Sequence, residues 1–148
     1  MYRKILVALE NGPADERLLP HICEFARRMD SALLLLHVAD GWAARNYEQL
    51  KLAESAEMKA DFEYLEKMAK RVSSQGLRVE TLLALGNPPN EIVRVAEESE
   101  CDLIALASHG HKFIGDLVHG STIDRVRHNT AVPLLVVSNK SGGTRPPM

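Results

Sequence analysis

The chain has 148 residues, of which 45% are hydrophobic and 26% are charged, and its formal net charge is −2. This length favours a single domain, and the composition is that of a folded globular protein rather than a disordered one. The slightly acidic balance argues against binding of nucleic acid through bulk positive charge, and the aromatic content of 5% leaves few rings for bases to stack on.

No apolar run approaches the roughly 20 residues that a membrane-spanning helix needs. The run at residues 5–9 is also too short for the core of a secretory signal. Cys23 and Cys101 form no CxxC pair, so two reduced thiols are the simplest interpretation. These features together lead us to expect a cytoplasmic protein.

Five short runs along the chain are almost continuously apolar. They cover residues 5–9, 32–38, 79–85, 103–107 and 132–137. A strand has this pattern when both of its faces are covered, as in a parallel sheet. The charged stretches between the runs have helical spacing, so the sequence predicts an α/β fold with a parallel sheet between two helical layers.

Four helices are predicted between these runs, at residues 13–29, 47–73, 87–99 and 121–129. Asn87 can cap the third helix, and Pro88 suits its first position. Residues 139–148 are polar and rich in glycine and proline, so we expect a disordered tail there. The domain itself is predicted to span residues 1–138.

The second predicted helix is the longest and carries a clear apolar stripe. Its members are spaced four, three, four and three residues apart: Met58, Phe62, Leu65, Ala69 and Val72. This spacing places them on one face of a helix. We therefore expect this face to pack on the sheet and the charged face to meet solvent.

The segment at residues 107–122 follows the fourth strand and contains three glycines. Glycines let backbone N–H groups approach an anion closely, and a helix N-terminus adds positive potential. In open α/β sheets, ligands bind beyond the carboxyl ends of the strands, at the switch point between the two halves. The segment therefore has the profile of a phosphate-binding loop.

Two interpretations of this segment stay open. Gly115 and Gly120 have the spacing of the Walker A glycines, but no lysine follows Gly120. The backbone of this segment can still bind phosphate. Alternatively, the glycines only make turns, with Ser121 as a helix N-cap and Asp124 completing a capping box. The two interpretations are compatible, because a capping hydroxyl can also meet a phosphate.

Several short motifs are informative in combination between residues 3 and 138. They are ILVALE (5–10), LLLHV (34–38), GNP (86–88) with Glu91-Ile92, DLI (102–104), SHG (108–110), Gly120-Ser121 and VPLLVV (132–137). In this order they resemble the universal stress protein family. The fold that the resemblance implies is a five-stranded parallel sheet in the order 3-2-1-4-5, with helices on both faces.

Members of that family that bind ATP carry the motif G-x2-G-x9-G-[ST]. This chain has Ala107-x2-Gly110-x9-Gly120-Ser121, so the first glycine is replaced by alanine. Glu10 stands where binding members usually place an aspartate that meets the ribose or a metal. The resemblance implies a small stress-response protein that binds ATP and acts as a ligand-dependent switch or interaction module.

The residues implied in nucleotide binding form three groups. The phosphates are assigned to Gly110, Gly120, Ser121 and Thr122. The ribose and adenine border on Ala8, Leu9 and Glu10, with Ala107 near the ribose. The adenine ring is placed between Val38 and Leu106, although the apolar members of this set are core residues whether or not a ligand binds.

A divalent ion, Mg²⁺ or Mn²⁺, is expected to arrive on the ATP phosphates rather than in a structural metal site. Glu10 is its candidate protein ligand, since Mg²⁺ takes one or two carboxylates beside phosphate oxygens. His109, His111 and His119 are only a weak zinc signal, because no cysteine lies near them.

Two other functions stay open. One is an interaction module that binds no nucleotide and acts only through protein contacts, as other members of the family do. The other is slow ATP hydrolysis, but Ser121 lacks a recognisable His–Asp partnership, so efficient catalysis is not expected.

The family also pairs its last strand with that of a second copy. The corresponding edge here is residues 134–137, which begins with Leu134 and ends with Val137. An unpaired apolar edge invites pairing, and a two-fold symmetric contact satisfies both copies at once. The resemblance therefore implies a homodimer through this strand.

Overall fold

Strands and helices alternate along the chain, as the sequence predicts. The computed structural model describes residues 1–40, 47–108 and 117–138. The strands in this part are β1 (Lys4–Leu9), β2 (Ala32–Asp40), β3 (Val79–Gly86), β4 (Leu103–Ser108) and β5 (Leu134–Ser138). The helices are α1 (Asp15–Met29), α3 (Tyr47–Ser73), α4 (Pro88–Glu98) and α5 (Leu117–Asn129).

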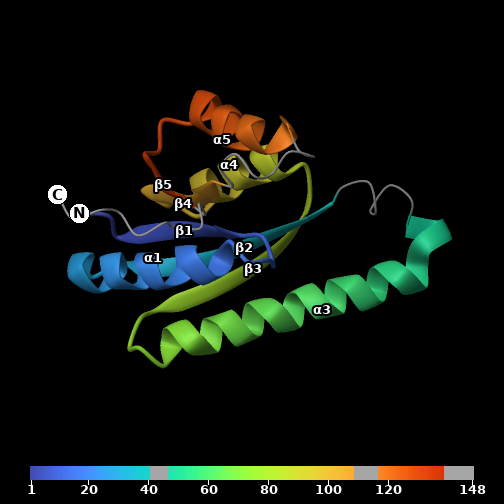
Figure 1. The fold of residues 1–148 in the computed structure, drawn as a ribbon, viewed down its shortest axis with the longest axis horizontal. Coiled ribbons are helices and arrows are strands. Elements are labelled where there is room, and N and C mark those ends of the chain that lie inside the picture. Colours follow the sequence, from blue (N-terminus) through green and yellow to red (C-terminus); the bar gives the residue numbers. More distant parts are fainter. Residues whose placement is uncertain (41–46, 109–116, 139–148) are drawn as a thin grey trace, which may run out of the picture.

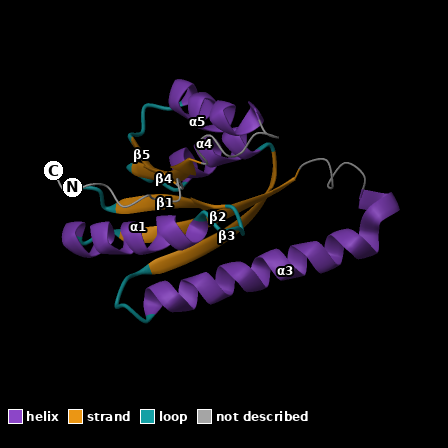
Figure 2. Ribbon diagram, viewed as in Figure 1, coloured by secondary structure: helices purple, strands orange, loops and turns teal. Residues whose placement is uncertain are grey.

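All the strands run parallel in one sheet of order β3-β2-β1-β4-β5, which confirms the predicted topology. Helices α1 and α3 cover one face, and α4 and α5 cover the other (Figures 1 and 2). The chain adds β2 and then β3 on one side of β1 within the sheet. It then crosses back and adds β4 and β5 on the other side of β1. None of the helices in the described residues is long and apolar enough to cross a bilayer.

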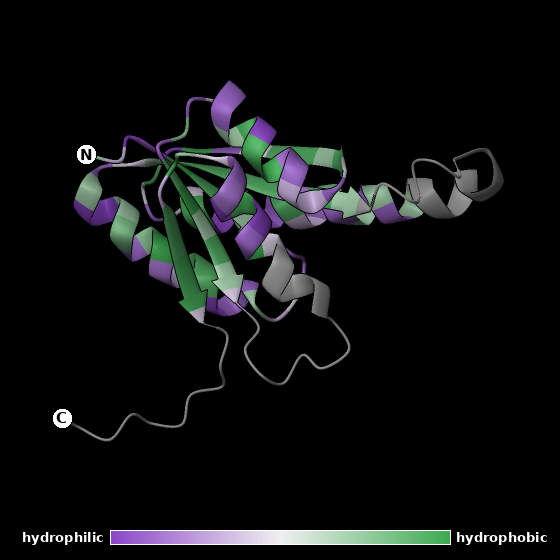
Figure 3. Ribbon diagram, turned by 90° about the horizontal axis from the view of Figure 1, so that it is seen from above, coloured by the Kyte–Doolittle hydropathy of each residue, from purple (hydrophilic) through white to green (hydrophobic). Residues whose placement is uncertain are grey.

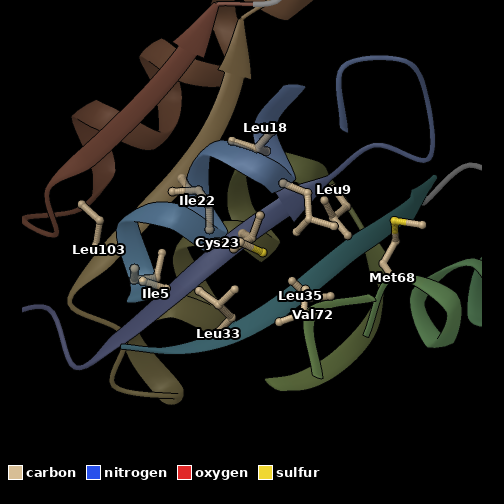
Figure 4. Close-up of a cluster of buried hydrophobic side chains, with 14 of the residues drawn as sticks. Ile5, Leu9, Leu18, Ile22, Cys23, Leu33, Leu35, Met68, Val72 and Leu103 are labelled. Carbon is tan, nitrogen blue, oxygen red and sulfur yellow. The ribbon is translucent and has the colours of Figure 1, made fainter. Parts of the chain in front are cut away.

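Two apolar clusters hold the layers together, because successive side chains of a strand point to opposite faces. On β1, Val7 packs toward α1 and α3, as do Ile5 and Leu9 (Figure 4). Leu6 and Ala8 pack toward α4 and α5. Burying one such leucine or isoleucine contributes about 1.5–3 kcal/mol to stability, so the central strands are the most strongly anchored.

The outer strands are less covered than their apolar sequences predict. Leu82 and Leu85 of β3 are 38% and 41% exposed, and Val136 of β5 is 43% exposed. The hydropathy colouring shows apolar strands throughout the sheet, with helices of mixed character around them (Figure 3). The expectation of two covered faces therefore holds for the central strands and is wrong at the edges, which the helices overlap only in part.

Helix α3 has the predicted bounds, and the predicted stripe is confirmed at Leu65, Ala69 and Val72, which pack in the core on the sheet. Among the residues of α3 whose side chains are described, Asp61, Leu65, Met68 and Val72 are buried. Phe62, which belongs to the predicted stripe, is 52% exposed. The stripe is wrong at this end because a buried aspartate, held by polar partners, takes the inward position.

The predicted helix boundaries are accurate for α4 and wrong for α5. Asn87 caps α4, as predicted, by accepting a hydrogen bond from the backbone N–H of Asn90 at 3.3 Å. Helix α5 begins at Leu117, so Gly120 and Ser121 lie inside its first turns rather than before it. Ser121 is therefore not the N-cap, and the capping-box interpretation is wrong.

Candidate functional site

The strands β1 and β4 part from one another near their carboxyl ends. Their register ends at Val7 opposite Ala105, although β1 continues to Leu9 and β4 to Ser108. These are the strands between which the direction of the connections reverses. Parting strands at such a switch point form the crevice in which open α/β sheets bind ligands.

A second feature of this end is the length of β2. Its register with β1 ends at His37 opposite Leu9, but β2 continues to Asp40. On the other side, β2 stays paired with β3 to Asp40 opposite Gly86. The backbone of β2 beyond His37 therefore extends past the end of β1, where a ligand could bind to its edge.

A cavity of about 180 Å³ lies at this crevice. Its walls come from the carboxyl ends of β1, β2 and β4, from the beginning of α4 and from the second turn of α5. They are Ala8, Leu9, Glu10, Leu36, His37, Val38, Pro88, Ile92, Leu106, Ala107, Thr122 and Ile123. Apolar walls with a few polar groups at one end suit a ligand with a flat ring and a polar tail.

The cavity lies on the α4 and α5 side of the sheet. Val38, Leu106 and Ile123 belong to the apolar cluster of that side. Leu9 and Ala107 also border the cavity, but their side chains belong to the cluster on the α1 and α3 side. The alternation of the strand implies that these two residues face the cavity mainly through their backbone.

Most of the residues implied by the resemblance meet at this cavity. They are Ala8, Leu9, Glu10, Val38, Leu106, Ala107 and Thr122. Gly120 and Ser121 precede Thr122 within the first turns of α5. Gly110 lies outside the described residues, as do His109, His111 and the predicted tail at residues 139–148.

Sequence reasoning missed some of the residues around the cavity. Leu36 could have been found, because it stands two positions before Val38 and shares its face of β2. Pro88, Ile92 and Ile123 depend on how α4 and α5 pack over the sheet, which no local pattern reveals.

The prediction that a divalent ion binds together with ATP concerns the acidic side chains near the cavity. Among the described residues, no group of three or more His, Cys, Asp or Glu residues is arranged to hold a metal ion. Glu10 is an exposed carboxylate at the edge of the cavity. This position suits a carboxylate that meets an ion carried on a ligand's phosphates.

Comparison with known proteins agrees with this architecture. Universal stress protein MJ0577 of Methanocaldococcus jannaschii is 28% identical over an alignment that covers 95% of this chain and 98% of the relative. A solved structure of MJ0577 superposes with a TM-score of 0.84 at 27% identity, over 96% of this chain and 99% of that one.

Two further structures share the fold at lower identity. A universal stress protein from Archaeoglobus fulgidus in complex with dAMP has a TM-score of 0.64 and 22% identity, over 92% of this chain and 98% of that one. A universal stress protein in complex with cAMP has a TM-score of 0.67 and 18% identity, over 93% and 97% of the two chains. The model of the universal stress protein family matches residues 1–138. The chain therefore belongs to the universal stress protein family.

Proposed function

We propose that the chain binds ATP in the cavity between β1 and β4 and acts in the stress response as a ligand-dependent switch or interaction module. The observation that carries the proposal is the early end of the β1–β4 register, at Val7 opposite Ala105, with an apolar cavity above it. The complexes of other universal stress proteins with dAMP and cAMP support an adenine nucleotide as the ligand.

In this proposal the walls of the cavity hold the adenine ring. Val38 and Leu106 come from strands on opposite sides of β1 and flank the space where the ring would lie. The backbone of β2 beyond His37 can hydrogen-bond the edge of the base, because β1 has already ended there. A base that is read by fixed backbone groups binds selectively.

The polar part of the nucleotide would lie toward Glu10 and α5. Glu10 accepts a hydrogen bond from a ribose hydroxyl or meets Mg²⁺ on the phosphates. Thr122 and the positive end of α5 favour the phosphate charge. Gly120 and Ser121 lie directly before Thr122 and are assigned to the same phosphates.

The simplest test is to look for nucleotide that purifies with the protein. Denaturing the purified protein should release adenine nucleotide into the supernatant, detectable by chromatography. Gly120→Val should abolish this release, because a branched side chain would intrude on the phosphates. Ser121→Ala should weaken ATP binding by about ten- to a hundredfold, the usual effect of losing a hydrogen bond to a charged group.

Thermal unfolding without ligand is the control for both variants. A folded Gly120→Val variant that binds ATP as well as the parent does would contradict the phosphate assignment. In that case an interaction module that works without nucleotide becomes the better account.

We further propose that the protein acts in the cytoplasm as a homodimer.

A further inference from the structure

The turn that follows β1 rests on two buried carboxylates, which lie on the face of the sheet opposite the cavity. Asp15, in the first turn of α1, is 1% exposed, and Asp61 of α3 is 7% exposed. Burial of a carboxylate is strongly unfavourable unless hydrogen bonds compensate it. The partners of these two groups therefore indicate what they stabilise.

Asp15 accepts hydrogen bonds from two consecutive backbone N–H groups of the turn. Its Oδ1 atom lies 2.9 Å from the nitrogen of Glu10, and its Oδ2 atom lies 2.9 Å from that of Asn11. The Tyr64 hydroxyl of α3 donates a third hydrogen bond, to Oδ2, at 2.5 Å. Burial and this carboxylate raise the pKa of Tyr64 well above its usual value, so the phenol keeps the proton that it donates.

Asp61 holds the same turn from α3. The Asn11 side chain donates from Nδ2 to Asp61 Oδ1 at 2.9 Å, and His37 Nε2 lies 3.5 Å from Asp61 Oδ2. The same ring donates from Nδ1 to the carbonyl oxygen of Leu9 at 2.9 Å, because a carbonyl can only accept. Asn11 has a φ of +60°, a conformation that asparagine tolerates better than most residues.

Hydrogen bonds thus hold the backbone on both sides of Glu10. The carbonyl before it is held by β2, and the N–H groups of Glu10 and Asn11 are held by α1. These contacts engage the backbone around Glu10 rather than its carboxylate, which borders the cavity. The support lies on the α1 and α3 side, so it can act without touching a ligand.

We propose that Asp15 and Asp61 are positioning residues of the nucleotide site, which set the direction in which Glu10 faces the ribose. This inference rests on the proposed function, in which Glu10 accepts a hydrogen bond from a ribose hydroxyl. A nucleotide without the 2′-hydroxyl offers Glu10 less to bind. The ratio of the affinities for ATP and dATP therefore measures how well Glu10 is placed.

Calorimetric titration of two variants with ATP and dATP tests this role. Tyr64→Phe removes one donor from Asp15, and Asp61→Leu replaces the second carboxylate by a side chain of similar size. We expect the wild type to prefer ATP by about tenfold or more, as for a hydrogen bond to a charged group. Both variants should lose most of this preference, because binding of ATP weakens more than binding of dATP.

Two controls separate positioning from general loosening. Tyr2→Phe removes the same hydroxyl at the opposite end of β1 and should keep the wild-type ratio. In a Glu10→Ala background, Asp61→Leu should cause no further loss of ATP affinity, because both changes remove the same interaction. Additive losses in this double variant, or an unchanged ratio in both single variants, overturn the inference while leaving ATP binding intact.

Amide hydrogen exchange without ligand tests the geometry separately. The amides of Glu10 and Asn11 should exchange at least about tenfold faster in Tyr64→Phe and Asp61→Leu, while that of Val7 stays protected. Unchanged exchange in both variants overturns the positioning role, whatever the protein binds. A wild type that binds neither nucleotide overturns the proposed function instead, and the exchange rates then still decide whether the carboxylates hold the turn.

Discussion

Ala107 stands where nucleotide-binding relatives of the family carry glycine, at the point where β4 has parted from β1. Its side chain packs with the cluster on the α1 and α3 side, whereas the cavity opens on the other side. The methyl group therefore points away from the space assigned to the ligand. This direction could not be read from the motif, which shows only that a methyl group has been added.

We expect Ala107→Gly to leave the ATP affinity within about twofold of the wild type. The same change should lower stability by about 0.5–1 kcal/mol, because glycine in a strand loses more backbone freedom on folding. Calorimetry and thermal unfolding measure the two effects on the same samples. An affinity that rises tenfold would mean that the methyl group does enter the site.

Cys101 is buried at 5% exposure, and burial raises the pKa of its thiol from the usual 9.0 to about 11. The unfolded chain loses this proton first as the pH rises, so the stabilisation is present below pH 9 and is lost toward pH 11. We predict that the free energy of unfolding falls over this range. Denaturant titrations should show a smaller fall for Cys101→Ala, and equal falls would contradict this assignment.

At the scale of elements, α4 carries part of the cavity wall and depends on its cap. Pro88 and Ile92 line the cavity, and the Asn87 side chain accepts the hydrogen bond that begins the helix. We expect Asn87→Ala to cost about 1 kcal/mol and to lower Tm by about 2–4 °C. Asn90→Ala keeps the donating backbone N–H and should leave Tm close to the wild-type value. Equal shifts in the two variants would show that the cap adds nothing.

The sequence predicts the elements well because apolar runs, caps and helical spacing are local signals. It fails at Phe62, because the stripe counts only apolar residues and passes over Asp61, whose partners are Asn11 in the turn after β1 and His37 of β2. It also fails at the start of α5, where Gly120 and Ser121 read as a loop and a cap but lie inside the helix.

The residues that the strands contribute to the candidate site could be predicted from the sequence. Those that depend on how the helices pack could not. The carboxyl ends of β1, β2 and β4 meet in any sheet of this order, so Ala8, Val38 and Leu106 could be grouped from the family pattern. The two buried carboxylates that hold the turn around Glu10 could not be predicted. Asp15 and Asp61 are far apart in the sequence, and in the sequence alone they resemble ordinary surface charges.

At the scale of the whole molecule, the sheet ends in β5, which pairs with β4 on one side. Val136 is 43% exposed on this strand. We predict a homodimer at micromolar concentration through this edge, measured by sedimentation. Val136→Pro should shift it toward monomer because proline removes a backbone donor. A monomer at every accessible concentration of the wild type would contradict this prediction.

We propose that the crevice between β1 and β4 recognises an adenine nucleotide through both its base and its phosphates. Calorimetric titration of the nucleotide-free protein with ATP and with GTP tests this most directly. We expect saturable binding of ATP and weaker binding of GTP, because backbone groups beyond the end of β1 would hydrogen-bond the edge of the adenine base. Equal affinities would show that only the phosphates are recognised, and the absence of binding by either nucleotide would contradict the proposed function itself.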